Sequence, residues 1–65
     1  MRISDETGNS LSSVYLALSD AEAAELADAL RELRTAHKGW HAHVSDSAYA
    51  KEITLYREDD ETAVI

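Results

Sequence analysis

The stretch that decides the fold covers residues 19–44 and reads SDAEAAELADALRELRTAHKGWHAHV. In its first part, apolar side chains recur at Leu26, Leu30 and Leu33, the i, i+4, i+7 spacing of one helical face. In its last part the period changes to two, which is the spacing of a strand. The stretch therefore predicts a helix over 20–36, followed directly by a strand.

Both ends of this helix carry residues that favour a helix boundary. Ser19 and Glu22 form a capping-box pattern, in which the two side chains bond backbone N–H groups at the helix start. Gly39 is placed to end the helix in a left-handed conformation. Acidic residues fill the first half and basic residues the second, and this order complements the helix dipole.

The following strand, predicted over 40–45, has two distinct faces. Its apolar residues share one face, and His41 and His43 share the other. This places two of the three histidines of the chain side by side on the outside of a sheet.

Three further segments are predicted strands. Residues 13–18 and 52–56 alternate between apolar and other side chains, and residues 2–4 could form a short strand. Turn-forming residues at 5–10 join the first two segments into a hairpin. The expected order is ββαββ, an α+β fold with a four-stranded antiparallel sheet and one helix packed on one face. The strand order stays open between 1-2-4-3 and 2-1-3-4.

The two faces of the predicted sheet differ in residue type. The helix-side face should bury Val14, Leu16, Leu18, Leu26, Leu30, Leu33, Trp40, Val44, Ile53 and Leu55. The open face should carry Tyr15, His41, His43, Glu52, Thr54 and Tyr56. Tyrosine and histidine are suited to a surface that is wet in the monomer and buried in a complex. The open face is therefore the predicted partner-binding surface, although an ordinary solvated sheet face would show the same residue types.

The chain is small, with 65 residues and no cysteine. A domain of this size has a marginal core, and without cysteine neither disulfides nor thiolate metal sites can reinforce it. Dimerisation, or a metal bound to the histidines, is the expected stabiliser. We expect one domain over 1–57 and an acidic tail over 58–65.

Acidic residues outnumber basic ones by thirteen to six, for a net charge of −7. This balance argues against direct binding to nucleic acid or to an anionic membrane, because both need a basic patch. Neither an apolar leader nor a long apolar run is present, so a cytoplasmic protein is expected. The acidity also allows an inhibitor or immunity-type protein that occupies a basic, nucleic-acid-binding site of another protein.

His41 and His43 are the candidate metal ligands, because residues i and i+2 of a strand lie about 6.6 Å apart along the chain. Zinc commonly takes at least three protein ligands, so Glu52, His37 or the histidine pair of a second copy would have to complete the site. The same pair could act as a pH switch through repulsion between protonated imidazoles. The plainer interpretation is that both histidines are ordinary polar residues on a solvated sheet face.

No pattern of catalytic residues stands out in the chain. Serines are plentiful but nothing marks one as a nucleophile, and His43 with Asp46 is the one conceivable base–orienter pair. The sequence therefore predicts a small non-enzymatic protein-interaction module without a cofactor. Its expected partner is a second copy, bound through the open sheet face or an edge strand, or another protein. The alternatives are the acidic inhibitor and a zinc-binding protein.

Overall fold

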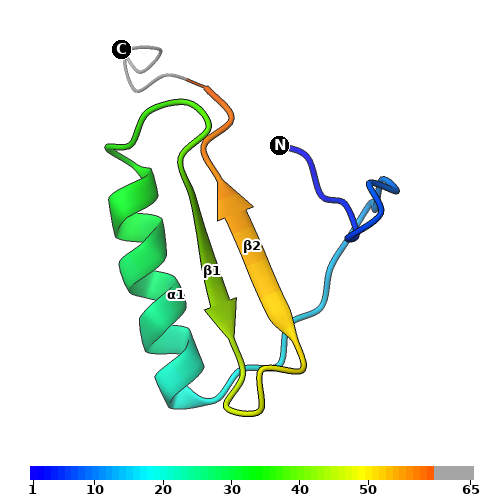
Figure 1. The fold of residues 1–65 in the computed structure, drawn as a ribbon, viewed down its shortest axis with the longest axis vertical. Coiled ribbons are helices and arrows are strands. Elements are labelled where there is room, and N and C mark those ends of the chain that lie inside the picture. Colours follow the sequence, from blue (N-terminus) through cyan, green and yellow to red (C-terminus); the bar gives the residue numbers. More distant parts are fainter. Residues whose placement is uncertain (60–65) are drawn as a thin grey trace.

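One helix and one two-stranded antiparallel sheet form the regular structure of residues 1–59, the part of the chain that this computed structural model describes. The helix α1 spans Asp20–Leu33, and strands β1 and β2 span His41–Ser45 and Glu52–Tyr56. Figure 1 shows α1 next to β1, and the N-terminal residues beyond the opposite edge of the sheet, next to β2. No helix in this part of the chain combines the length and the apolar character that a membrane crossing requires.

The start of α1 confirms the predicted cap. Ser19 Oγ accepts a hydrogen bond from Glu22 N at 3.1 Å, and Glu22 Oε1 accepts one from Ser19 N at 2.8 Å. This capping box satisfies backbone N–H groups that no helical carbonyl can reach. The helix ends at Leu33, earlier than predicted, because Thr35 N and Ala36 N bond carbonyls three residues back, the tighter pattern of a 3-10 turn.

Gly39 adopts the left-handed conformation that its position predicts, with a φ of 89°. It stands in the connection to β1 rather than directly after the helix. Its N–H donates to Arg57 O at 3.1 Å, so the entry to β1 is fixed beside the end of β2.

The face of α1 that packs on β1 is centred on Ala29, which is 8% exposed. Leu26 and Leu33 are half-buried on either side of it. The prediction that Leu30 belongs to the core is wrong, since its side chain is 47% exposed. The small Ala29 lets the helix backbone approach β1 closely. With Ala29 facing β1, the helix is rotated about its axis relative to the predicted orientation, and Leu30 points toward solvent.

β1 and β2 form an antiparallel hairpin whose two faces match the predicted alternation. The helix-side pairs are Ala42–Leu55 and Val44–Ile53. The open-face pairs are His41–Tyr56, His43–Thr54 and Ser45–Glu52. The helix-side residues are buried or half-buried, whereas the open face is mostly exposed.

Asp46 holds the turn between the two strands. Its Oδ1 accepts hydrogen bonds from Ala50 N at 2.8 Å and Lys51 N at 3.2 Å, and its backbone O accepts one from Tyr49 N at 3.0 Å. The bonds from Lys51 N and then Ala50 N hold the pKa of the Asp46 carboxyl below its ordinary value. Tyr49 takes a positive φ of 55° in this turn, and its side chain is 85% exposed.

The predicted four-stranded sheet is wrong, since β1 and β2 are the only strands within residues 1–59. Residues 2–4 and 13–18, expected to supply the other two strands, do not form them. Residues 13–18 lead into α1 as irregular chain, and none of their backbone groups bonds the backbone of β2.

The N-terminal segments reverse in a tight turn but do not form the predicted hairpin strands. The Asp5 carboxylate accepts hydrogen bonds from backbone and side-chain groups inside the turn, so the chain reverses tightly around it. The two arms then meet at one isolated bridge, between Ser4 and Ser10. Leu11 N donates to Ile3 O at 2.7 Å, and within residues 1–59 no further backbone bond joins the two arms beyond it. Within residues 1–59 the backbone of residues 14–18 pairs with no other strand.

The hydrophobic core of the described residues is small. Ala29 and Val44 are its only buried hydrophobic members. The predicted burial of the segment before α1 is wrong, because Val14, Leu16 and Leu18 are 54%, 50% and 38% exposed. Much of the apolar surface that further strands would have covered is therefore open.

The beginning of the predicted acidic tail contacts the folded body. Asp59 Oδ1 accepts a hydrogen bond from Nε of Arg57, the one buried charged residue within residues 1–59. Glu58 Oε1 accepts a hydrogen bond from Arg2 Nε at 2.7 Å. The rest of that tail, residues 60–65, lies outside the described residues.

Candidate functional site

Five of the six residues predicted for partner binding meet on the open face of the hairpin. They are His41, His43, Glu52, Thr54 and Tyr56. Tyr15 does not join them, because it lies in the irregular segment before α1, where its side chain is 93% exposed. A role of this face in binding a partner stays a prediction.

Hydrogen bonds connect His43, Thr54 and Glu52 on the open face. Thr54 Oγ1 donates to Glu52 Oε1 at 3.3 Å, and His43 Nδ1 lies 3.0 Å from Thr54 Oγ1. The Thr54 hydroxyl has one hydrogen to donate, so the donor and acceptor in its contact with His43 depend on the tautomer of the imidazole ring.

This arrangement is not a catalytic triad. In a triad, one ring nitrogen of the histidine meets the nucleophile while a carboxylate orients the other nitrogen. Here Thr54 Oγ1 and Glu52 Oε1 both approach Nδ1 of His43, at 3.0 and 3.5 Å. Asp46, the orienting residue considered from the sequence, uses its carboxylate to hold the turn.

The rings of His41 and His43 lie close together on the open face. Their centroids are 5.3 Å apart and their planes are inclined by 74°, an edge-to-face contact. Among residues 1–59, no group of three or more histidine, aspartate or glutamate side chains is placed to hold a metal ion. The third zinc ligand that the sequence analysis required is therefore not supplied by Glu52 or His37 of the same chain.

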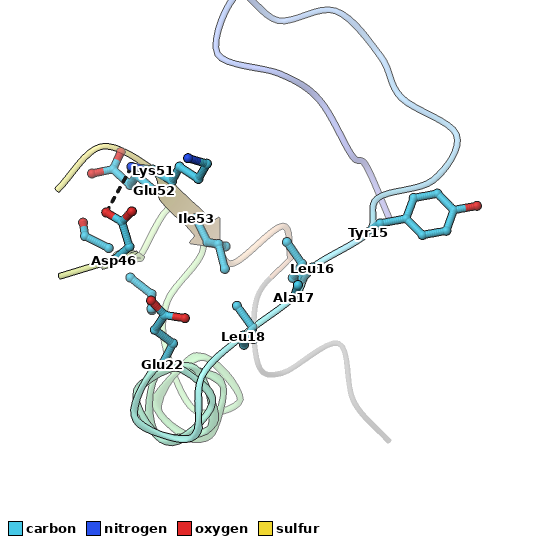
Figure 2. Close-up of a pocket in the computed structure, with 11 residues that line it drawn as sticks. Tyr15, Leu16, Ala17, Leu18, Glu22, Asp46, Lys51, Glu52 and Ile53 are labelled. Atoms are coloured by element: carbon cyan, nitrogen blue, oxygen red, sulfur yellow. Dashed lines mark hydrogen bonds between the residues drawn. The ribbon is translucent and has the colours of Figure 1, made fainter. Parts of the chain in front are cut away.

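A hollow with apolar walls lies on the helix-side face, next to the start of β2 (Figure 2). It has a volume of about 320 Å³, and Leu16, Leu18, Val44 and Ile53 contribute to its walls. Figure 2 shows Ile53 pointing toward the segment that carries Leu16 and Leu18, whereas the ring of Tyr15 points away. A third strand in this position would have closed the hollow.

The rim of the hollow is acidic. It includes Glu22 from the start of α1, Asp46 from the turn and Glu52 from β2, with Lys51 as the one basic residue of the lining. One oxygen of each carboxylate already accepts a hydrogen bond, from the helix cap, the turn or Thr54. Within residues 1–59 the second oxygen of each is free to accept a bond from a cationic group.

A groove continues from the hollow along the outer edge of β2. Its far wall is the N-terminal segment 2–7, and its near wall includes Glu52, Thr54 and Tyr56. The larger part of the groove has a volume of about 800 Å³. The hollow and the groove share Glu52, and together they are named the β2-side surface.

Ionic contacts near the end of β2 hold the N-terminal wall of this groove. Besides the bond from Arg2 to Glu58, the terminal ammonium of Met1 lies 3.6 Å from Glu58 Oε2. The Arg2 guanidinium also lies 5.8 Å from the centre of the Tyr56 ring, in a cation–π contact. The hydrogen bond from Arg2, followed by the charge of the terminal ammonium, lowers the pKa of Glu58. These groups are exposed, so the wall is held only weakly.

Protein-family models, curated proteins and solved structures were compared with the chain, and none matched.

Sequence reasoning missed the β2-side surface because it assigned Leu16 and Leu18 to a buried strand. A signal for the surface is present in the sequence. The arm before the N-terminal turn, 2–4, is shorter than the arm after it, 13–18, so hairpin pairing cannot cover the longer arm.

Proposed function

We propose that this chain is a non-enzymatic protein-interaction module that binds its partner through the β2-side surface. The observation that carries the proposal is the concentration of exposed apolar side chains beside that surface. Of the nine large hydrophobic residues exposed within residues 1–59, five lie between positions 11 and 18. They are Leu11, Val14, Tyr15, Leu16 and Leu18, and the side chains of Val14, Leu16 and Leu18 line the hollow or the groove. Contiguous apolar patches on small proteins commonly mark contact surfaces.

The small core supports the same proposal. With Ala29 and Val44 as its only buried hydrophobic residues, the described part of the chain buries little apolar surface. A partner seated over Leu16 and Ile53 would add roughly 1.5–3 kcal/mol for each side chain that becomes fully buried. Binding would thereby stabilise the folded chain by mass action.

Charge indicates the kind of partner. The hollow combines apolar walls with the carboxylates of Glu22, Asp46 and Glu52, and the whole chain carries a net charge of −7. A complementary protein surface presents apolar side chains flanked by lysine or arginine. An acidic inhibitor or immunity-type protein is one form of such a module. A second copy, the homodimer expected from the sequence, would have to overcome repulsion between two acidic chains.

Affinity capture from the source cells tests the proposal when it compares the wild type with two matched variants. Leu16→Ser removes part of the apolar wall of the hollow. Leu30→Ser makes the same change on α1 at a side chain that is 47% exposed and lines no part of the β2-side surface. We expect the wild type and Leu30→Ser to capture the same protein, and Leu16→Ser to lose it while its circular dichroism stays unchanged.

Two results would contradict the proposal. One is equal capture by all three proteins, and the other is the absence of any protein that the wild type captures specifically. The salt dependence of binding distinguishes an acidic inhibitor, held mainly by its carboxylates, from a module held mainly by apolar contacts. A partner held mainly by carboxylates should dissociate when the salt is raised to roughly 0.5 M, whereas one held by apolar contacts should stay bound.

A further inference from the structure

The outer edge of β2 has no strand beside it within residues 1–59. The hydrogen bonds at the two ends of the hairpin show which backbone groups this edge exposes. At one end, Arg57 N donates to Trp40 O at 2.8 Å. At the other end, Asp46 N donates to Lys51 O at 3.2 Å. Bonded pairs recur at every second residue of an antiparallel ladder, so the odd-numbered residues of β2 bond β1.

The even-numbered residues of β2 point their backbone N–H and C=O groups away from β1. These residues are Glu52, Thr54 and Tyr56, and no other backbone group of residues 1–59 bonds theirs. The same three residues line the groove whose far wall is the segment 2–7. A row of unpaired backbone groups along a groove is a template for one more strand.

We propose that the partner inserts an extended segment into this groove and adds it as a third strand to the outer edge of β2. The inference rests on the proposed function and names the way in which the partner binds. Hydrogen bonds to the backbone of Glu52, Thr54 and Tyr56 hold the added strand. The side chains of that strand alternate between two faces and determine which sequences fit.

The two faces of the groove select different side chains. On the helix side the added strand meets Leu16 and Ile53, so every second side chain of the partner segment is apolar. On the open side the acidic residues Asp5, Glu6 and Glu52 outnumber the one basic residue of this lining, Lys51. Within residues 1–59 the Glu6 carboxylate forms no ion pair of its own. The intervening side chains of the segment are therefore basic.

A second copy of the chain fits this groove less well. Its β2 would arrive with β1 and α1 attached, whereas the segment 2–7 bounds the groove on the far side. It would also bring a second net charge of −7 to an acidic surface. A single extended segment with positive charge meets both conditions.

A defined peptide tests this inference before the native partner is known. The probe is a short peptide of alternating valine and lysine, added to isotope-labelled protein, and the matched control peptide carries glutamate in place of lysine. We expect the valine–lysine peptide to shift the backbone amide resonances of Glu52, Thr54 and Tyr56 and to slow their hydrogen exchange. The valine–glutamate peptide should leave these amides unchanged.

Thr54 offers a matched pair of variants. Thr54→Pro removes the central outward N–H without removing a bond to β1, whereas Thr54→Val removes the hydroxyl and keeps that N–H. We expect Thr54→Val to retain peptide binding and Thr54→Pro to lose it, while the resonances of β1 persist in both. If Thr54→Pro unfolds the hairpin, strand addition is tested by the wild type alone, through the slowing of amide exchange at Glu52, Thr54 and Tyr56 when the valine–lysine peptide is added.

Several results would overturn strand addition. They are an equal response to both peptides, peptide-induced shifts confined to His41 and His43, and slow exchange of the Thr54 amide before any peptide is added. A wild-type dimer that excludes the peptide would do the same. A native partner that is lost with Leu16→Ser but kept by a folded Thr54→Pro would reject strand addition alone and leave the proposed function standing.

Discussion

Arg57 Nη1 donates a hydrogen bond to the carbonyl oxygen of Leu33 at 2.9 Å, so the residue that follows β2 caps the last turn of α1. The same nitrogen donates to Arg34 O at 2.9 Å, and Nε donates to Asp59 Oδ1. The cap adds a donor to the carbonyls at the helix end, of which Leu33 O also accepts from Ala36 N at 3.2 Å. It also places a positive charge at the negative end of the helix dipole. This contact ties the end of the hairpin to the end of the helix.

Loss of the Arg57 cap should destabilise the fold. We expect Arg57→Met to lower the free energy of unfolding by roughly 1.5–3 kcal/mol, because hydrogen bonds to a buried charged group are lost while apolar volume is retained. Urea unfolding measures the change. Arg31→Gln is the matched control, since Arg31 pairs with Asp28 on an exposed surface, and we expect a loss below about 0.5 kcal/mol. Equal midpoints for the two variants would show that the cap is not formed in solution.

The rotation of α1 predicts opposite sensitivities for two neighbouring residues. Leu30→Ala should cost less than about 1 kcal/mol, because the leucine side chain is already half exposed. Ala29→Leu should cost roughly 1–3 kcal/mol, because added methylene groups would push the helix away from β1. Thermal unfolding of both variants checks the assignment. A large loss of stability in Leu30→Ala with none in Ala29→Leu would show that Leu30, rather than Ala29, faces β1.

Asp46 should make the hairpin turn sensitive to acid. Hydrogen bonds from Lys51 N and Ala50 N lower the pKa of this carboxyl in the folded state. The stability it contributes is therefore complete above the ordinary value of 3.8 and is lost as the pH falls from there through the folded-state pKa. We expect Asp46→Asn to remove this part of the acid sensitivity, because asparagine keeps an acceptor oxygen without titrating.

Unfolding curves recorded from neutral pH downward test the role of Asp46. Some acid sensitivity should persist in the variant, because the Thr7 hydroxyl lowers the pKa of Asp5 and the Arg2 guanidinium lowers that of Glu58. Identical pH profiles for the wild type and Asp46→Asn would argue against the carboxylate as the group that holds the turn.

We expect the histidine pair to make no measurable contribution to zinc binding. His41 and His43 stack edge to face, but residues 1–59 bring no third ligand to them. Calorimetric titration with zinc should give the same heat for the wild type and for the double variant His41→Ala/His43→Ala. A larger heat from the wild type would show that the pair binds metal, with a ligand from a second copy completing the site.

Local patterns predicted the elements that depend on nearby residues. The capping box at Ser19 and the alternation around His43 each act within a few positions, and the structure confirms the helix start and both strands of the hairpin. The same alternation separated the open face from the helix-side face. Tyr15 was misplaced because alternation alone does not show whether a segment has a neighbour with which to pair.

The sequence by itself therefore determined where α1 begins, which residues form β1 and β2, and which of their side chains share a face. Only the tertiary structure decided that Ala29 rather than Leu30 meets β1 and that Arg57 caps α1. It also decided that no strand of residues 1–59 covers the outer edge of β2. Each of these features depends on which distant backbone and side-chain groups come within bonding distance. Within residues 1–59 the two N-terminal arms meet at the Ser4–Ser10 bridge, residues 14–18 form no strand, and no strand lies beside the outer edge of β2.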